Sequence, residues 1–159
     1  MPRSASLPKF QARRVLLCTD LSPVSEQILP LARALLSKGG LLRLLHVVEP
    51  VLVPTYAGPD AVVPIFDRAA TKQRVAITQR RLTATAKQLG IKGTQVKVVE
   101  ADQAAKAIGA EAKRFRADLV CLSTHGRSAL QRMLFGSVAL KLLAHYHGRV
   151  LLLRPSHVR

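Results

Sequence analysis

Short apolar runs alternate with longer helical patterns along the chain, and this alternation constrains the fold more than any other feature. Strands that alternate with helices form parallel sheets, which helices cover on both faces through right-handed crossovers. A run that is apolar throughout is typical of such a covered strand, whereas an alternating run is typical of an edge strand. The sequence therefore predicts an α/β fold with a five-stranded parallel sheet and helices on both faces. The apolar runs are residues 14–19, 41–48, 117–122 and 149–155, and the alternating run is residues 94–100.

Helical patterns fill the intervals between these runs. In the first interval, Ser22 can cap a helix, Pro23 suits its first position, and the pair Gly39-Gly40 ends it. Pro30 lies inside this pattern and should bend the helix. The apolar side chains expected on its buried face are Val24, Ile28, Leu31 and Leu35. The other predicted helices are residues 68–89, residues 102–115 with a cap at Asp102, and residues 137–148, ended by Gly148.

A proline-rich segment, residues 49–67, separates the second strand from the helix at 68–89. Its four prolines exclude a regular helix and a central strand. We therefore expect a long Pro-rich loop, either a functional lid or a mobile segment. Its apolar side chains favour packing on the domain or on a partner.

The length of 159 residues fits one domain, residues 1–159, of which residues 1–12 are expected to be a flexible N-terminal tail. No stretch is apolar and long enough to span a membrane, and no apolar segment follows the basic residues at the N-terminus. We therefore expect a cytoplasmic protein with no membrane partner. Cys18 and Cys121 lie in apolar runs, where buried, reduced thiols are expected; a redox role would need an exposed thiol of low pKa.

A formal net charge of +16 bears on the choice of partner. Between Asp67 and Glu100 the chain contains no acidic residue. Such a basic segment attracts polyanions in general, including nucleotides, nucleic acid and acidic membranes, and selects none of them. Trp is absent and aromatic residues are 4% of the chain, so few side chains can recognise nucleic acid by stacking on its bases. The basic residues are Arg68, Lys72, Arg74, Arg80, Arg81, Lys87, Lys92 and Lys97, and a solvated face is their simplest interpretation.

Candidate binding residues follow the predicted strands. In open parallel sheets, ligands bind beyond the carboxyl ends of the strands, near the topological switch point. Thr19 and Asp20 follow the first strand, His46 and Val47 end the second, and the stretch from Ser123 follows the fourth. Two structural interpretations compete with binding: Asp20 can cap the turn that precedes the first helix, and His46 is favoured as a packed, hydrogen-bonded side chain.

The stretch "STHGRSALQRMLFGSVA", residues 123–139, has the residues of a phosphate site. Gly126 follows the fourth strand, and Gly136 opens the next helix, so backbone N–H groups and a helix N-terminus can converge on an anion. The P-loop and dinucleotide fingerprints are absent, as are hydrolase and zinc-protease motifs. On these residues alone an ordinary turn before a helix is favoured, and phosphate binding is the alternative. Side chains that can assist binding are Ser137, Arg127 and Arg132.

Several of these segments together resemble the universal stress protein family, over essentially the whole chain. The segments are "TDLS" after the first strand, "HV" at the end of the second, and residues 123–139 leading to "GRVLLLRP". The nucleotide-binding branch of that family carries G-x-x-G, nine residues, and G-[ST]. Residues 123–126, the nine residues 127–135 and the pair Gly136-Ser137 match it, except that Ser123 stands in place of the first glycine.

The resemblance implies a Rossmann-like fold, similar to the adenine nucleotide alpha hydrolases, and an adenine nucleotide as ligand. ATP is the expected ligand, with Mg²⁺ held through its phosphates, and no catalytic residue or protein metal ligand is implied. Cys18 stands where relatives often have a proline, and residues 100–102 stand where they have a glycine-containing turn. The implied nucleotide contacts are Cys18, Thr19, Asp20, Val47, Ser123, His125, Gly126, Arg127, Gly136, Ser137 and Val138.

The predicted function is that of an ATP-binding regulator in a stress response, with at most slow hydrolysis because no activated nucleophile or general base is evident. The family also has a branch that binds no nucleotide. Membership of that branch would leave a basic scaffold for nucleic acid or an acidic protein. Ser123 would add only a hydroxymethyl group if its φ is negative, but would block the site if φ is positive. The strand at residues 150–153 is a candidate hydrophobic edge, which monomers normally protect. Dimers of the family that the chain resembles pair through this region, so the resemblance implies a homodimer through it.

Overall fold

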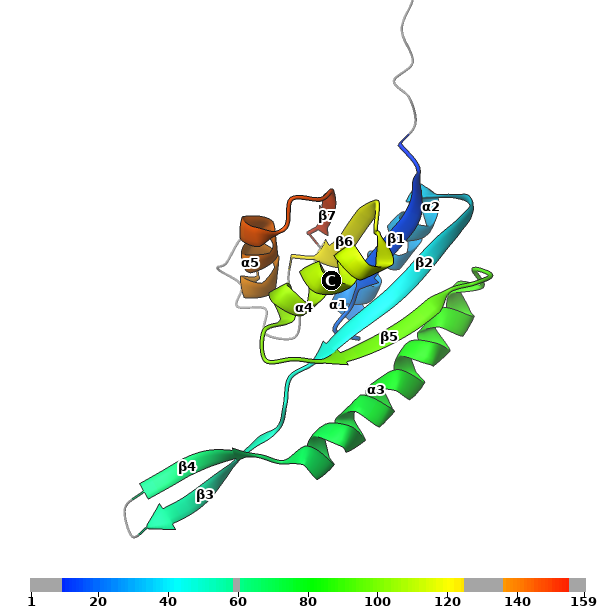
Figure 1. Ribbon diagram of the computed structural model, residues 1–159. Coiled ribbons are helices and arrows are strands. Elements are labelled where there is room, and N and C mark those ends of the chain that lie inside the picture. The colour runs from blue at the N-terminus through cyan, green and yellow to red at the C-terminus, as the bar shows by residue number, and fades with distance from the viewer. Residues whose placement is uncertain (1–9, 59–60, 125–135, 155–159) are drawn as a thin grey trace, which may run out of the picture.

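The computed structural model describes residues 10–58, 61–124 and 136–154 (Figure 1). The main sheet is parallel, which confirms the predicted fold class. The chain starts at the central strand of this sheet, adds two strands toward one edge, and then adds two on the other side of the central strand. The topological switch point therefore lies between the central strand and the first strand added on that second side. The spatial order is β5 (Gln95–Glu100), β2 (Leu36–Val48), β1 (Ala12–Cys18), β6 (Leu119–Ser123) and β7 (Val150–Leu153).

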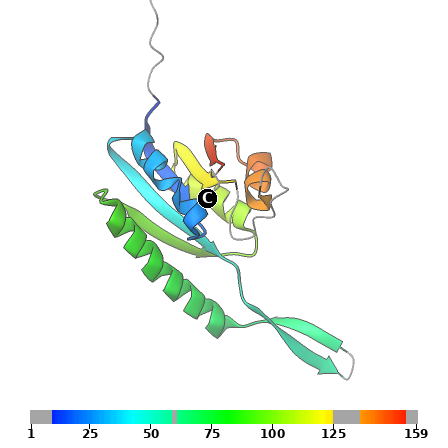
Figure 2. The ribbon, with the colours of Figure 1, turned by 180° about the vertical axis from the view of Figure 1, so that it is seen from behind.

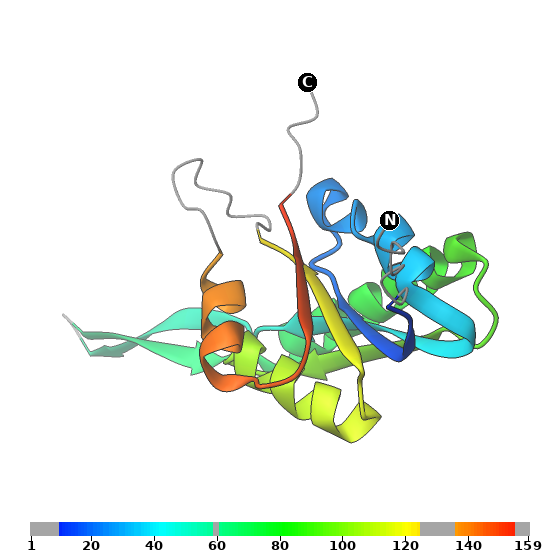
Figure 3. The same ribbon diagram turned by 90° about the horizontal axis from the view of Figure 1, so that it is seen from above.

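Helices cover both faces of this sheet (Figures 2 and 3). One face carries α1 (Pro23–Glu26), α2 (Leu29–Leu35) and α3 (Arg68–Leu89), and the other carries α4 (Ala104–Phe115) and α5 (Ser137–His145). Strand β1 supplies side chains to both layers, since successive residues of a strand point to opposite faces. Val15 and Leu17 pack in the first layer, whereas Leu16 and Cys18 pack in the second. Ala12 is buried in β1, so the sheet begins inside the segment expected to be a tail.

The helix predicted between the first two strands is wrong in extent. Two short helices replace it, because Pro30 lies in the first turn of α2, where a proline fits. Leu31, which was expected on the buried face, is exposed, whereas Ile28 is buried. Gly39 and Gly40 do not end a helix but lie within β2, where the pairing with β1 shifts in register. Gly39 adopts φ +76°, a conformation that suits glycine at such a bulge.

The helix predicted at 68–89 is confirmed as α3. Its first turn is capped by Asp67, whose Oδ1 accepts a hydrogen bond from the N–H of Ala70 at 2.8 Å, and Gly90 ends it in the left-handed region. The predicted cap at Asp102 is wrong, because α4 starts after Gln103 without a side-chain cap. The last helix also ends earlier than predicted, at His145.

The segment 49–67 is a hairpin and not the predicted irregular loop. Strands β3 (Leu52–Gly58) and β4 (Ala61–Phe66) form a separate antiparallel pair, which projects beyond the main sheet (Figure 1). The prolines excluded a central strand, and this remains true, but a two-stranded ribbon consists only of edge strands, which tolerate proline. Among the residues that the structure describes, no helix has the length and apolar character needed to cross a membrane.

Candidate functional site

A cavity of about 360 Å³ opens at the carboxyl ends of β1, β2 and β6, within the size range of small-molecule sites. This is the place that the strand-end rule predicts for a ligand. The structure brings together predicted residues that are far apart in sequence. His125, Gly126 and Arg127 lie outside the described residues. The predicted residues that line the cavity are Cys18, Thr19, Asp20, Val47, Ser123, Gly136, Ser137 and Val138.

The turn after β1 is held by the hydroxyl of Thr19. Its Oγ1 accepts a hydrogen bond from the N–H of Leu21 at 2.9 Å and lies 2.8 Å from Oγ of Ser25. Leu21 has φ +60°, which is uncommon for a residue with a side chain. Because the buried hydroxyl of Thr19 serves the turn, this residue is first a structural support of the cavity wall.

Asp20 caps the same turn, which confirms the structural interpretation of this residue. Its Oδ1 accepts hydrogen bonds from the N–H of Ser22 at 3.0 Å and from the hydroxyl of Ser22 at 2.6 Å. Asp20 also lines the cavity. An ionised carboxylate can accept about four hydrogen bonds, so capping and ligand binding are compatible roles.

His46 joins the ends of two strands. Its Nδ1 lies 2.7 Å from the carbonyl oxygen of Thr19, and because a carbonyl oxygen only accepts, Nδ1 is the protonated nitrogen. The packed, hydrogen-bonded interpretation of His46 is therefore confirmed. The side chain also forms part of the cavity wall, beside Val47.

Ser123 stands in the motif where the family pattern has a glycine. It is the last residue of β6 and pairs with Leu153 of β7 in the extended conformation of a strand. Among the described non-glycine residues, positive φ occurs at Leu21 and Arg116 and not at Ser123. The serine therefore adds a hydroxymethyl group to the cavity wall without backbone strain.

Gly136 brings the start of α5 against the end of β6. Its N–H donates to the carbonyl oxygen of Thr124, and a Cβ at position 136 would lie 2.7 Å from that oxygen. This close approach requires a glycine even without a ligand. The next two residues, Ser137 and Val138, open α5 at the cavity. Among the described residues no side chain caps α5, and the N-terminus of a helix favours an anion.

Two charged residues at the cavity were missed by the sequence. Glu49 follows β2, and Arg74 reaches the cavity from α3. Arg74 was assigned with its neighbours to a solvated basic face. It is exposed, and the ion pairs between described residues do not include it. No sequence feature indicates that Arg74, and not another arginine of α3, lines the cavity. Its position there depends on how α3 crosses the end of β2.

Both cysteines are buried and unpaired by any disulfide. Burial raises the pKa of the Cys121 thiol to about 12. Burial, with a smaller contribution from Cys121, also raises the pKa of Cys18. The exposed, low-pKa thiol that a redox role requires is therefore not found at either position. No group of three or more His, Cys, Asp or Glu side chains suited to a metal ion occurs in the described parts of the chain.

Comparison with known proteins adds a family match. The model of the Universal stress protein family matches residues 11–154. The comparison with curated proteins returned no match.

Solved structures share the fold. One is a universal stress protein in complex with cAMP, at 18% identity and a TM-score of 0.63, covering 92% of this chain and 99% of that chain. UspA from Lactobacillus plantarum is 15% identical with a TM-score of 0.66, and the match covers 91% of this chain and 99% of that chain. A universal stress protein from Archaeoglobus fulgidus in complex with dAMP is 15% identical with a TM-score of 0.51, and the match covers 91% of this chain and 98% of that chain. At these identities the likeness shows the fold alone.

Proposed function

Because the chain belongs to the universal stress protein family, we propose that its cavity binds an adenine nucleotide, with ATP as the ligand, and that binding acts as a switch in a stress response. One observation carries this proposal: residues from three distant segments meet around a single cavity. Asp20 comes from the first segment, Val47 from the second and Ser137 from the third. Two structural neighbours of this chain are complexes with cAMP and dAMP, which supports an adenine nucleotide as the ligand class.

We assign the phosphates to the end of the cavity formed by α5. The N-terminus of a helix carries a partial positive charge and uncapped N–H groups, which favour an anion. Ser137 adds a hydroxyl group at this end. Arg74 lines the cavity from the side of α3, and its positive charge would attract the phosphates across the cavity. Mg²⁺ would reach the site with the nucleotide and remain on its phosphates.

We assign the adenosine part to the strand ends. Val47 and Ile108 supply apolar surface for the base, and the Asp20 carboxylate can accept hydrogen bonds from ribose hydroxyls or from the base. Hydrolysis is expected to be slow at most. Asp20 and His46 both hold the strand ends through hydrogen bonds, and neither hydrogen bond activates a nucleophile.

Thermal unfolding with added ligand tests the proposal. A ligand that binds the folded state raises Tm, by an amount that grows with its concentration above Kd. We expect Mg-ATP to raise Tm, and we expect denatured protein to release adenine nucleotide if the site was filled during expression. An unchanged Tm at saturating Mg-ATP, with no nucleotide released, would show that the cavity does not bind it.

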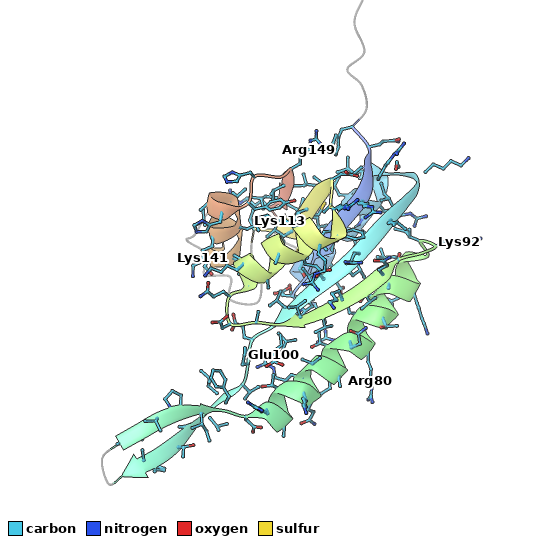
Figure 4. All side chains as sticks on the ribbon, in the orientation of Figure 1. Arg80, Lys92, Glu100, Lys113, Lys141 and Arg149 are labelled. Atoms are coloured by element: carbon cyan, nitrogen blue, oxygen red, sulfur yellow. The ribbon has the colours of Figure 1, made fainter. Side chains whose placement is uncertain are left out.

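The basic face of α3 supports a second candidate function. Its cationic residues are exposed, and α3 contains no acidic residue to offset them. Figure 4 shows Arg80 of α3, and Lys92 just beyond its end, on the outer side of the protein. A polyanion or an acidic protein is the partner that such a face fits. Binding to DNA, RNA or an acidic protein should weaken steeply as salt is added, and a lack of binding at low salt would exclude this role.

A further inference from the structure

Both faces of the hairpin β3-β4 carry apolar side chains. On one face Ile65 and Val63 are 47% and 43% exposed, whereas the other face is apolar at every pair and more exposed. Residues opposite each other in an antiparallel pair have side chains on the same face, and alternate residues of each strand share it. The register places three such pairs on one side of the ribbon. We call them the apolar hairpin face, which consists of Leu52 with Phe66, Pro54 with Pro64, and Tyr56 with Val62.

The apolar hairpin face is uncovered in the single chain. Tyr56 is 81% exposed, Phe66 66%, Val62 55% and Leu52 53%. No other part of the described chain concentrates so many exposed large apolar side chains. Contiguous apolar surface of this kind marks interaction sites, and a two-stranded ribbon with no further packing is marginally stable in water. The ribbon therefore needs a covering surface.

The base of the hairpin is fixed to α3, so the ribbon is presented in a defined direction. The N–H of Val51 donates to Oγ1 of Thr71 at 3.0 Å, and the N–H of Asp67 donates to the carbonyl oxygen of Val51 at 2.9 Å. Thr71 is buried. From this anchor the ribbon extends away from both helix layers (Figures 1 and 2).

Charge selects among the surfaces that can cover the ribbon. Residues 51–66 contain one charged residue, Asp60, in a chain of net charge +16. Two copies that met through α3 would bring many cations together, whereas the ribbon lets them meet without this repulsion. Nucleic acid is disfavoured because the ribbon holds no cation for phosphates. A lipid interior is disfavoured because the open edges of a two-stranded ribbon carry N–H and C=O groups that hydrocarbon cannot satisfy.

We propose that the apolar hairpin face is a self-association surface, covered by the same face of a second copy of this chain about a two-fold axis. Such a contact is isologous, which means that the same residues of both copies form it. The face presents on the order of 600 Å² per copy, and the pair buries about 1,200 Å², which is the lower end of specific interfaces. This surface is separate from the β7 edge and does not depend on nucleotide binding.

Light scattering after size-exclusion chromatography tests the proposal with a matched pair of variants. Tyr56→Asp places a charge on the apolar hairpin face, whereas Thr55→Asp places the same charge on the opposite face of the same strand. We expect Tyr56→Asp to halve the molar mass of the wild-type assembly, and Thr55→Asp to leave it unchanged. Circular dichroism should show the same secondary structure and fold for all three proteins.

Cross-linking provides a second readout. A bifunctional maleimide long enough to bridge the paired ribbons should cross-link two copies of Val62→Cys more efficiently than two copies of Val63→Cys, which lies on the opposite face; Cys18 and Cys121 are buried and do not compete. Equal molar masses for wild type and Tyr56→Asp would overturn the proposal, as would equal dissociation by both aspartate variants. Sedimentation of the wild type with anionic phospholipid vesicles, lost in Tyr56→Asp without a change in mass, would assign the face to a lipid surface and overturn it too.

Discussion

Asp20 and Thr19 illustrate how single residues serve structure and site together. Both side chains make hydrogen bonds inside the turn after β1, and both residues line the cavity. The sequence identified these positions because residues that follow buried parallel strands collect at one edge of the sheet. It did not identify Arg74, because no local sequence feature distinguishes this residue from the other exposed cations of α3. Only the crossing of α3 past the end of β2 brings it to the cavity.

Arg74 provides a prediction at this scale, with Arg80 of the same helix as its control. Arg74→Gln removes a cation that lines the cavity, whereas Arg80→Gln removes one that does not. An exposed charge pair is worth about 1 kcal/mol, so we expect Arg74→Gln to weaken ATP about fivefold. Adenosine affinity should not change. Isothermal titration calorimetry measures both ligands, and equal loss of ATP affinity in the two variants would indicate a general charge effect.

Ser123 provides a second residue-scale prediction. Since its backbone is extended and φ is not positive, the hydroxymethyl group sits on the wall of the cavity without forcing a shift of the chain. We expect Ser123→Gly to leave the Kd for ATP within about threefold of wild type, which corresponds to less than about 0.7 kcal/mol. A tenfold or greater tightening, measured by the same titration, would mean that the serine obstructs the nucleotide.

The elements show where local signals decide structure and where they do not. Helix α3 was predicted close to its observed bounds, and the structure shows Asp67 capping its first turn and Gly90 ending it. The interval before β2 was mispredicted because Gly39 serves a bulge and not a helix end, and both roles favour the same residue type. The hairpin was mispredicted because prolines exclude a central strand but do not exclude an isolated two-stranded ribbon, in which both strands are edge strands.

Two glycines allow an element-scale prediction with opposite signs. Gly136→Ala forces a Cβ against the Thr124 carbonyl oxygen, so we expect a loss of about 1–3 kcal/mol in the free energy of unfolding. Gly109→Ala lies inside α4, where the added Cβ makes only an ordinary contact at 4.0 Å with Tyr146. It should gain about 0.5–1 kcal/mol through helix propensity. Urea unfolding measures both, and destabilisation by Gly109→Ala or tolerance of Gly136→Ala would contradict the packing described here.

The whole molecule combines a predictable fold with an unusual charge. The alternation of strands and helices was sufficient to predict the parallel sheet, because each buried run needs helices on both faces. Charge placement was less predictable. The ion pairs among described residues converge on Glu111, which meets Arg43 and Arg114, so most cations have no acidic partner in the described chain. Self-repulsion should therefore lower the stability of the free protein.

Salt dependence tests this at the molecular scale. Added NaCl screens repulsion between exposed like charges, so we expect Tm to rise from low to moderate ionic strength. Sodium gluconate at the same ionic strength serves as a control for specific binding of chloride, and it should produce a similar rise. A Tm that falls or stays constant would show that the excess positive charge does not destabilise the folded chain.

A crystal structure of the protein with Mg-ATP tests the central claim most directly. We predict that the phosphates lie at the start of α5, near Gly136 and Ser137, and that the ribose or base contacts Asp20. A nucleotide bound elsewhere, or a cavity that stays without nucleotide at saturating Mg-ATP, would contradict the proposed function.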